Sequence, residues 1–348
     1  MAQQHLDPTD PPATAVMAVT GEALGAYLSA RATEFLRALR LHRETGAAAG
    51  AHESADAARA LRRAARRISG SLHTFRPFLD TDWSEEMRPE LAWLSGTLAM
   101  EHAYEARLER LLLALHRLSG SSPFPGQSGE RTGPATGTPE RGNLTVGAAK
   151  AGALLERQLT LARTRAHSTA LQALGSSRFH AVADKVALLA SEVPLAPAAA
   201  ATDPRPQAAA AEERLLAAIA ALPLVTAGLP YNAEALIHGL SPDPSPHPQD
   251  GPWHQVRLLL RLHRYAREVL DGPGAPVDVP LLTAGQALNR HRDASEAAAA
   301  AAQAARTPRI APATAYALGV LHADQRHEVE AARYTFQQSW QQEAVGAP

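Results

Sequence analysis

The chain has 348 residues, enough for two lobes, and it lacks cysteine, which excludes disulfides and thiolate metal sites. Its 34 basic and 35 acidic residues leave a formal net charge of -1, and its aromatic content of 5% favours alanine-rich helices over a β-rich core. No run of 18 apolar residues and no signal-peptide pattern occurs, so we expect a soluble, cytoplasmic protein without membrane contact.

Helical patterns fill most of the sequence after a leader, residues 1–19, that we expect to be disordered. No window alternates β-branched with polar residues, so no strand is predicted and the fold class is all-α. Residues 120–143 are predicted to be a flexible linker and residues 241–252 a proline-rich loop. The predicted helices run from about 21–42, 55–79, 85–118, 145–174, 176–192, 208–221, 253–270, 281–306 and 312–343.

Two of these helices carry a stripe of basic residues. The first stripe has Arg59, Arg62, Arg66 and Arg67 at offsets 0, 3, 7 and 8, with Arg63 beside them. The second has His254, Arg257, Arg261 and Arg264 at offsets 0, 3, 7 and 10, which lie within an arc of roughly 80° on one helix face. Such a stripe is ordinarily a solvated face, or it pairs with acids of a neighbouring helix such as those in "DTDWSEEMRPE".

The charge pattern favours a different interpretation. Neither 59–79 nor 253–267 contains an acidic residue that could neutralise the stripe four positions along the helix. Two such helices facing one another would repel unless a polyanion lay between them. The sequence therefore predicts a polyanion site shared by two helices that are far apart in the chain.

The motifs resemble those of the CHAD domain family, the conserved histidine α-helical domains. "RALRRAARRISGSLHTFRPFLD" is similar to the first signature of the family and "WHQVRLLLRLHRYAREVL" to its second, and the resemblance extends over about 24–340. It implies two antiparallel four-helix bundles related by a pseudo-twofold axis, at about 20–192 and 208–340, with 341–348 as a tail. It also implies that inorganic polyphosphate binds in a basic channel between the bundles, here without a CYTH triphosphatase domain.

The resemblance assigns a binding role to residues of both stripes and of the helix pair between them. The candidate polyphosphate-binding residues are Arg59, Arg62, Arg63, Arg66, Arg67, Arg165, His254, Arg257, Arg261 and Arg264. The sequence departs from the family pattern at Arg59 (histidine in the family), Ser69 (arginine), His102 and Ala103 (an Arg-Asp pair), and Leu258 and Leu262 (basic residues). We therefore expect a channel that is less basic than in a typical member.

No other motif indicates chemistry. No histidine spacing suits a metal, no P-loop or GxGxxG is present, and no nucleophile with a positioned base is visible, so we expect no metal, no cofactor and no catalysis. The leading hypothesis is a non-catalytic polyphosphate-binding protein in the cytoplasm or on polyphosphate granules. Few aromatic residues stand near the stripes, which disfavours nucleic acid as the partner.

Two alternatives stay open. A degenerate CHAD fold could act as a scaffold for a protein partner, and acidic side chains of Glu101 or Glu105 reaching the channel would favour this function. The other alternative is an enzyme or binding protein for a small phosphorylated molecule, with His254 and Tyr265 as conceivable proton carriers.

Overall fold

The computed structural model describes residues 20–48, 51–120, 139–199, 201–229, 247–272 and 274–346. In these ranges the chain is almost entirely helical, and its only β contact is an isolated bridge between Leu79 and Leu195. The all-α prediction is confirmed. The predicted leader, most of the predicted linker and the first part of the proline-rich loop lie outside the described residues.

All nine predicted helices are found in the described part of the chain. Pro77 has no N–H to donate, so the second helix ends at Thr74 and a 3₁₀ turn, η1, follows over Arg76–Phe78. The four-residue helix α7 and the 3₁₀ turn η2 were not predicted. The α-helices are α1 Gly21–Ala48, α2 Ala51–Thr74, α3 Thr81–Ser119, α4 Pro139–Leu174, α5 Ser177–Ser191, α6 Arg205–Ala220, α7 Leu224–Ala227, α9 Gly251–Asp271, α10 Val279–Ala305 and α11 Pro312–Gly346, and η2 is Pro248–Asp250.

Side-chain caps fix where several of these helices begin. The carboxylate of Asp80 accepts a hydrogen bond of 2.8 Å from the backbone N–H of Trp83 at the start of α3. Asp278 caps α10 in the same way, through the N–H of Leu281 at 2.9 Å. Each carboxylate accepts a hydrogen bond from a backbone N–H that has no partner within the helix, so Asp80 and Asp278 fix the residues at which α3 and α10 begin.

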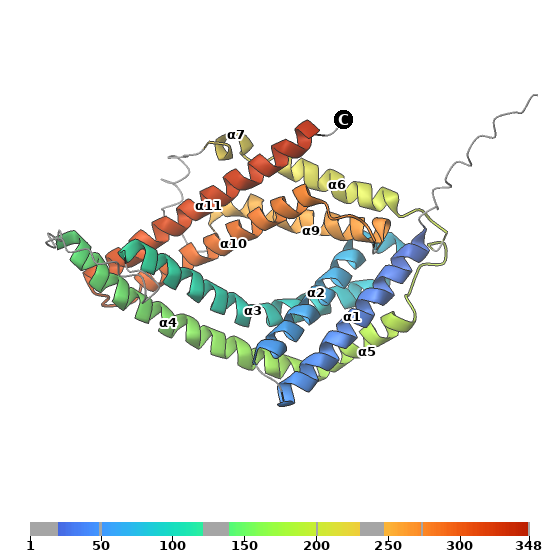
Figure 1. Cartoon of the computed structure of the whole chain (residues 1–348). Coiled ribbons are helices and arrows are strands. Elements are labelled where there is room, and N and C mark those ends of the chain that lie inside the picture. The colour runs from blue at the N-terminus through green and yellow to red at the C-terminus, as the bar shows by residue number, and fades with distance from the viewer. Residues whose placement is uncertain are drawn as a thin grey trace, which may run out of the picture.

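The hydrophobic residues form three cores along the molecule. The first is built mainly by α1, α2, α5 and the N-terminal half of α3, and it buries Phe35 and Ile68. The third lies among α6, α9, the start of α10 and the end of α11, around Trp253. The second core joins the C-terminal half of α3 and the N-terminal half of α4 to α10 and α11 at one end of the molecule, around Leu155 and Leu318. Figure 1 shows the hairpins α3–α4 and α10–α11 converging at this end of the molecule.

The second core therefore takes residues from both of the bundles expected from the sequence. The division at 192 and 208 and the pseudo-twofold axis stay predictions. Among the described helices, none combines the length and the hydropathy that crossing a bilayer requires.

Candidate functional site

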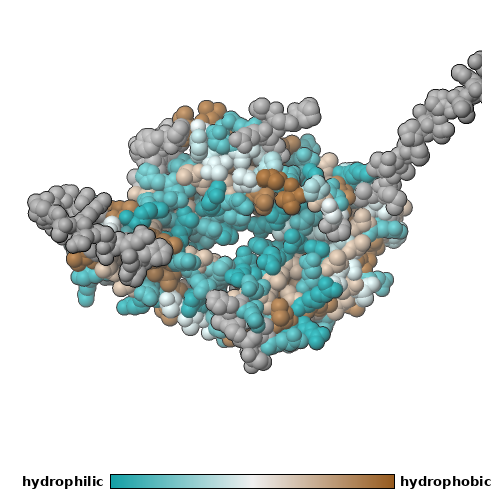
Figure 2. All heavy atoms as spheres, in the orientation of Figure 1, coloured by the Kyte–Doolittle hydropathy of each residue, from teal (hydrophilic) through white to brown (hydrophobic). Residues whose placement is uncertain are grey.

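The two predicted basic helices, α2 and α9, pack against each other close to the middle of the molecule. Gly70 of α2 allows this close approach, because a Cβ atom at this position would lie only 2.6 Å from Cδ2 of Tyr265 on α9. Tyr265 is buried, so its ring has little room to move away. Figure 2 shows an opening near the middle of the face in view, with mainly hydrophilic residues around its rim.

Five arginines, which we call the arginine cluster, come together from three helices. Arg62 and Arg66 lie on α2, Arg257 and Arg261 on α9, and Arg292 on α10. Each is partly buried, and each of the four from α2 and α9 is repelled by Arg292 and by others of the cluster. The structure thus brings the centres of both predicted stripes to one place.

Burial and mutual repulsion lower the pKa values of the arginines from α2 and α9. Burial, followed by repulsion from Arg62, lowers the pKa of Arg66 to about 10. Burial, followed by repulsion from Arg261 and Arg292, lowers the pKa of Arg257 to about 9. Because both values lie above neutral pH, the guanidinium groups stay charged in spite of their unfavourable surroundings.

None of the four arginines from α2 and α9 forms an ion pair with an acid in the described ranges, although the charges of Glu296 and Asp293 act on Arg257 from a longer distance. The Nε atoms of Arg66 and Arg257 are also buried without any hydrogen-bond partner. Half-buried charges without an ion-pair partner destabilise a fold, so an arrangement like this one points to an anion as the missing partner.

Arg292 was not among the binding residues predicted from the sequence. Its Nε donates to Asp293 at 2.9 Å and lies 3.7 Å from a carboxylate oxygen of Glu296. Glu296 also pairs with Arg107 of α3. A single arginine on α10 forms no stripe, so only the packing of α10 against α9 reveals that Arg292 belongs with the cluster.

The expectation that both stripes lack acidic partners is wrong at Glu268, which lies one residue beyond the segment considered. Its Oε2 accepts hydrogen bonds of 2.9 Å from Arg67 Nε and 2.9 Å from the Tyr27 hydroxyl. The Nε of Arg264 lies 3.6 Å from its Oε1. Two of the predicted binding arginines therefore already share a carboxylate of the protein.

The remaining predicted residues lie around this centre. Arg59 pairs with Asp56, one turn earlier on α2, which again corrects the expectation of an unpaired stripe. Arg63 on α2 and Arg165 on α4 are exposed, and the charge of Arg63 adds to the repulsion on Arg62. Their role in binding stays a prediction. His254 is half-buried at the start of α9, and burial lowers its pKa.

Glu101 and Glu105, which would have favoured a scaffold, are engaged on the surface. Glu101 pairs with His167 at 3.0 Å, and Glu105 pairs with Arg163 at 3.2 Å. The acids that do adjoin the arginine cluster are Glu268 and the neighbours of Arg292. No group of three potential metal ligands is found in the described part of the chain.

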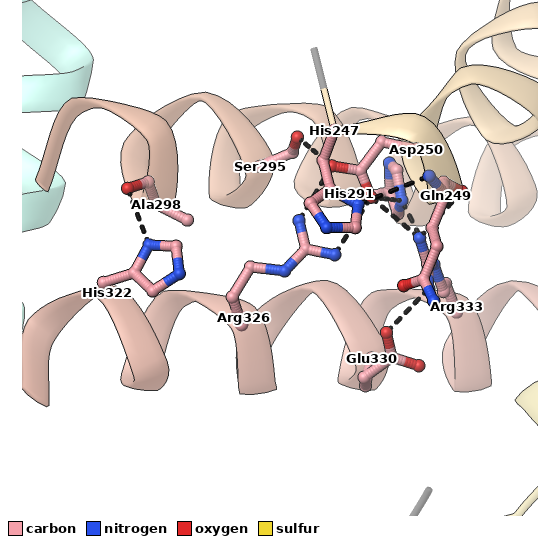
Figure 3. Close-up of polar contacts among 10 residues, drawn as sticks. All are labelled: His247, Gln249, Asp250, His291, Ser295, Ala298, His322, Arg326, Glu330 and Arg333. Atoms are coloured by element: carbon pink, nitrogen blue, oxygen red, sulfur yellow. Dashed lines mark hydrogen bonds and ion pairs between the residues drawn. The ribbon is translucent and has the colours of Figure 1, made fainter. Parts of the chain in front are cut away.

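Behind the cluster, a buried ion network holds the N-terminus of α9 against α10 and α11 (Figure 3). Its centre is Asp250, which is fully buried in η2 directly before α9. Arg326 donates to its two carboxylate oxygens at 2.8 and 3.2 Å, Arg333 donates at 2.7 Å, and Ser295 donates from α10. Burial alone would raise the pKa of Asp250, but the hydrogen bonds and charge of Arg326, with Ser295, hold it well below its usual range.

The network continues into the residues that support His254. Arg333 Nε donates to Nε2 of His291 at 3.3 Å, which fixes His291 as neutral with its proton on Nδ1. Burial and the charge of Arg333 lower the pKa of His291 well below its usual value. The ring of His291 stacks on Trp253 and meets His254 edge to face, with centroids 5.5 Å apart. The position of His254 therefore depends on buried residues of α10 and α11.

The chain is similar to a known protein family and to a solved structure. The CHAD domain family model matches residues 30–302 of the chain. Among solved structures, PptA from Streptomyces chartreusis is 70% identical, with a TM-score of 0.77 over 93% of this chain and 100% of that one. None of the curated proteins compared with the chain matches it. Since the family match covers most of the chain, including both basic helices, this protein belongs to the CHAD domain family.

Proposed function

We propose that this protein binds inorganic polyphosphate, without catalysing its breakdown, in the opening beside the arginine cluster. The observation that carries the proposal is the set of four half-buried arginines from α2 and α9 without an acidic partner among the described residues. Membership of the CHAD family, in which the resemblance implies polyphosphate binding, supports the same ligand.

The ligand fits the site for physical reasons. Polyphosphate carries a negative charge at each internal phosphate, so one flexible chain could contact guanidinium groups on α2, α9 and α10 together. Arginine donates to phosphate oxygens as a planar fork, and such charge-assisted hydrogen bonds are about twice as strong as neutral ones. Binding would also relieve the repulsion that lowers the pKa of Arg66 and Arg257.

The number of free arginines sets the expected salt dependence. Each contact with a flexible polyanion contributes about -0.7 to the slope of log affinity against log salt concentration. Four unpaired arginines therefore give a slope of about -3, which is a loss of about 50-fold in affinity between 50 and 200 mM salt. Arg292 adds less, because Asp293 and Glu296 already neutralise it.

The test is binding of labelled long-chain polyphosphate across a salt series. Replacing Arg257 alone by alanine should reduce the magnitude of the slope by roughly 0.7. The fourfold variant Arg62→Ala/Arg66→Ala/Arg257→Ala/Arg261→Ala should not bind. It should be no less stable than the wild type, because it removes buried like charges. Arg40→Ala is the matched control, since Arg40 is an exposed residue of α1 that pairs with Glu44.

A wild-type protein that fails to bind at 50 mM salt would overturn the proposal. So would binding that the fourfold variant retains, because the anion would then lie elsewhere on the surface. A competition with single-stranded RNA separates polyphosphate from nucleic acid. RNA that competes at equal phosphate concentration would show that the site recognises polyanions in general.

A further inference from the structure

Two acid-containing groups border the unpaired arginines. On one side Glu268 is held by Arg67, Arg264 and Tyr27. On the other side Asp293 and Glu296 are held by Arg292, and Glu296 also by Arg107. The two stripes predicted from the sequence therefore contain more arginines than the folded protein leaves without an ion pair in its described part.

Glu268 lies next to the cluster rather than at a remote surface. Arg67 follows Arg66 on α2, and Arg264 lies one turn after Arg261 on α9. Tyr265 lies beside both groups, because its ring approaches Gly70 of α2 and its side chain influences the pKa values of Arg66, Arg67 and Arg261. The guanidinium carbon of Arg264 also sits 5.4 Å from the centroid of this ring. An anion that followed the arginines beyond Arg66 and Arg261 would meet the carboxylate of Glu268.

We propose that Glu268 sets the length of polyphosphate that the protein recognises, by occupying Arg67 and Arg264 and ending the free positive path there. The inference rests on the proposed function above. The carboxylate accepts hydrogen bonds from Arg67 and neutralises Arg264 across 3.6 Å, and its own charge repels further phosphates. Side-chain exposures of 26% for both Arg67 and Glu268 show that solvent, and hence a bound chain, can reach this pair.

The acid-bordered site predicts a short recognition length. In the wild type, affinity should rise with polyphosphate length only until the chain is long enough to contact all four free arginines. Any further increase in length should add no affinity per binding segment. In Glu268→Gln, Arg67 and Arg264 become available while the amide keeps the shape of the side chain. The salt slope for long chains should steepen by about 1.4, two contacts of about 0.7 each. Affinity should continue to rise to longer chains.

The experiment measures salt slopes for tripolyphosphate and for long-chain polyphosphate in wild type, Glu268→Gln and Asp271→Asn. Asp271 is the matched control, because it lies on the same helix and loses the same charge but pairs with Arg267 on the surface. The inference predicts a steeper slope for long chains in Glu268→Gln alone, and little change for tripolyphosphate. Equal slopes in Glu268→Gln and Asp271→Asn, with both variants folded, would overturn it.

Arg67→Ala keeps the test decisive if Glu268→Gln folds poorly. In the wild-type background it should change the slope far less than Arg257→Ala does, because Glu268 already neutralises Arg67. A loss as large as that of Arg257→Ala would show that Arg67 binds the ligand and would overturn the inference. In a folded Glu268→Gln background, Arg67→Ala should remove about half of the gain. If the wild type does not bind polyphosphate at all, the proposed function fails instead, and the two failures are distinguishable.

Discussion

Replacing Asp250 by asparagine should destabilise the protein strongly, because its carboxylate is the counter-charge for two buried arginines. Asp250 is 0% exposed, Arg326 is 2% and Arg333 is 4% exposed, so water cannot replace the lost charge. Removing one partner of a buried ion pair costs about 3–5 kcal/mol in free energy of unfolding. For a domain of this size, that corresponds to a fall in melting temperature of roughly 10 °C.

The assay is chemical denaturation at pH 7 with Asp271→Asn as the control. The pair of Asp271 with Arg267 is exposed, so that variant should lose about 0.5 kcal/mol or less. A second variant, Asp250→Asn/Arg326→Met, removes the cation that Asp250→Asn leaves without an ion pair among the described residues, and it should be more stable than Asp250→Asn alone. Equal stability of Asp250→Asn and Asp271→Asn would refute the buried network as the anchor of α9.

The same residue predicts how acid acts on the fold. The folded protein holds the pKa of Asp250 well below the value of about 4 in the unfolded chain. This contribution to stability is complete above about pH 4, and it is lost as the pH falls through the lower folded value. The wild type should therefore lose stability below about pH 4, and Asp250→Asn should lose less over the same range. Parallel losses in the two proteins would contradict this assignment.

Three further outcomes follow from the site. Gly70→Ala should lower the free energy of unfolding by about 1–3 kcal/mol and weaken polyphosphate binding, because the added methyl group would collide with Tyr265. Gly96→Ala should be neutral or stabilising, since no atom lies within 4 Å of the added methyl group. Burial lowers the pKa of His254 in the free protein, and a bound polyanion would raise it. Affinity should therefore increase as the pH falls from the raised pKa of the bound state towards the lowered pKa of the free protein, and His254→Asn should flatten this profile. Polyphosphate at 100 times its dissociation constant should stabilise the wild type by about 2.7 kcal/mol, which thermal unfolding detects as a shift of about 5 °C.

Periodicity and composition were sufficient to predict the helices, because each long helix has its own apolar face and its own caps or breakers. Pro77 and the caps at Asp80 and Asp278 are local signals. The short helix α7, by contrast, covers only four residues of α-helix, which is too short for a periodic pattern.

The residues of the candidate site could be predicted only in part, because residue spacing within one helix does not show contacts between helices. The stripe spacing identified Arg62, Arg66, Arg257 and Arg261, since a helix face can be calculated from residue number. Whether an arginine is neutralised depends on contacts between distant segments, such as the bonds of Tyr27 and Arg67 to Glu268. No spacing rule within one helix reveals such contacts.

The second core, in which α3 and α4 pack against α10 and α11, determines whether either half of the chain could fold alone. The ends of α3 and α4 bury Leu111, Leu115 and Leu155 against α10 and α11, not against the rest of the first half. A polypeptide that stopped after α5 would present these side chains to water as an apolar surface, and it would tend to self-associate. The two halves therefore should not survive as independent units, and gene fragments that encode either half alone should produce aggregated or oligomeric protein.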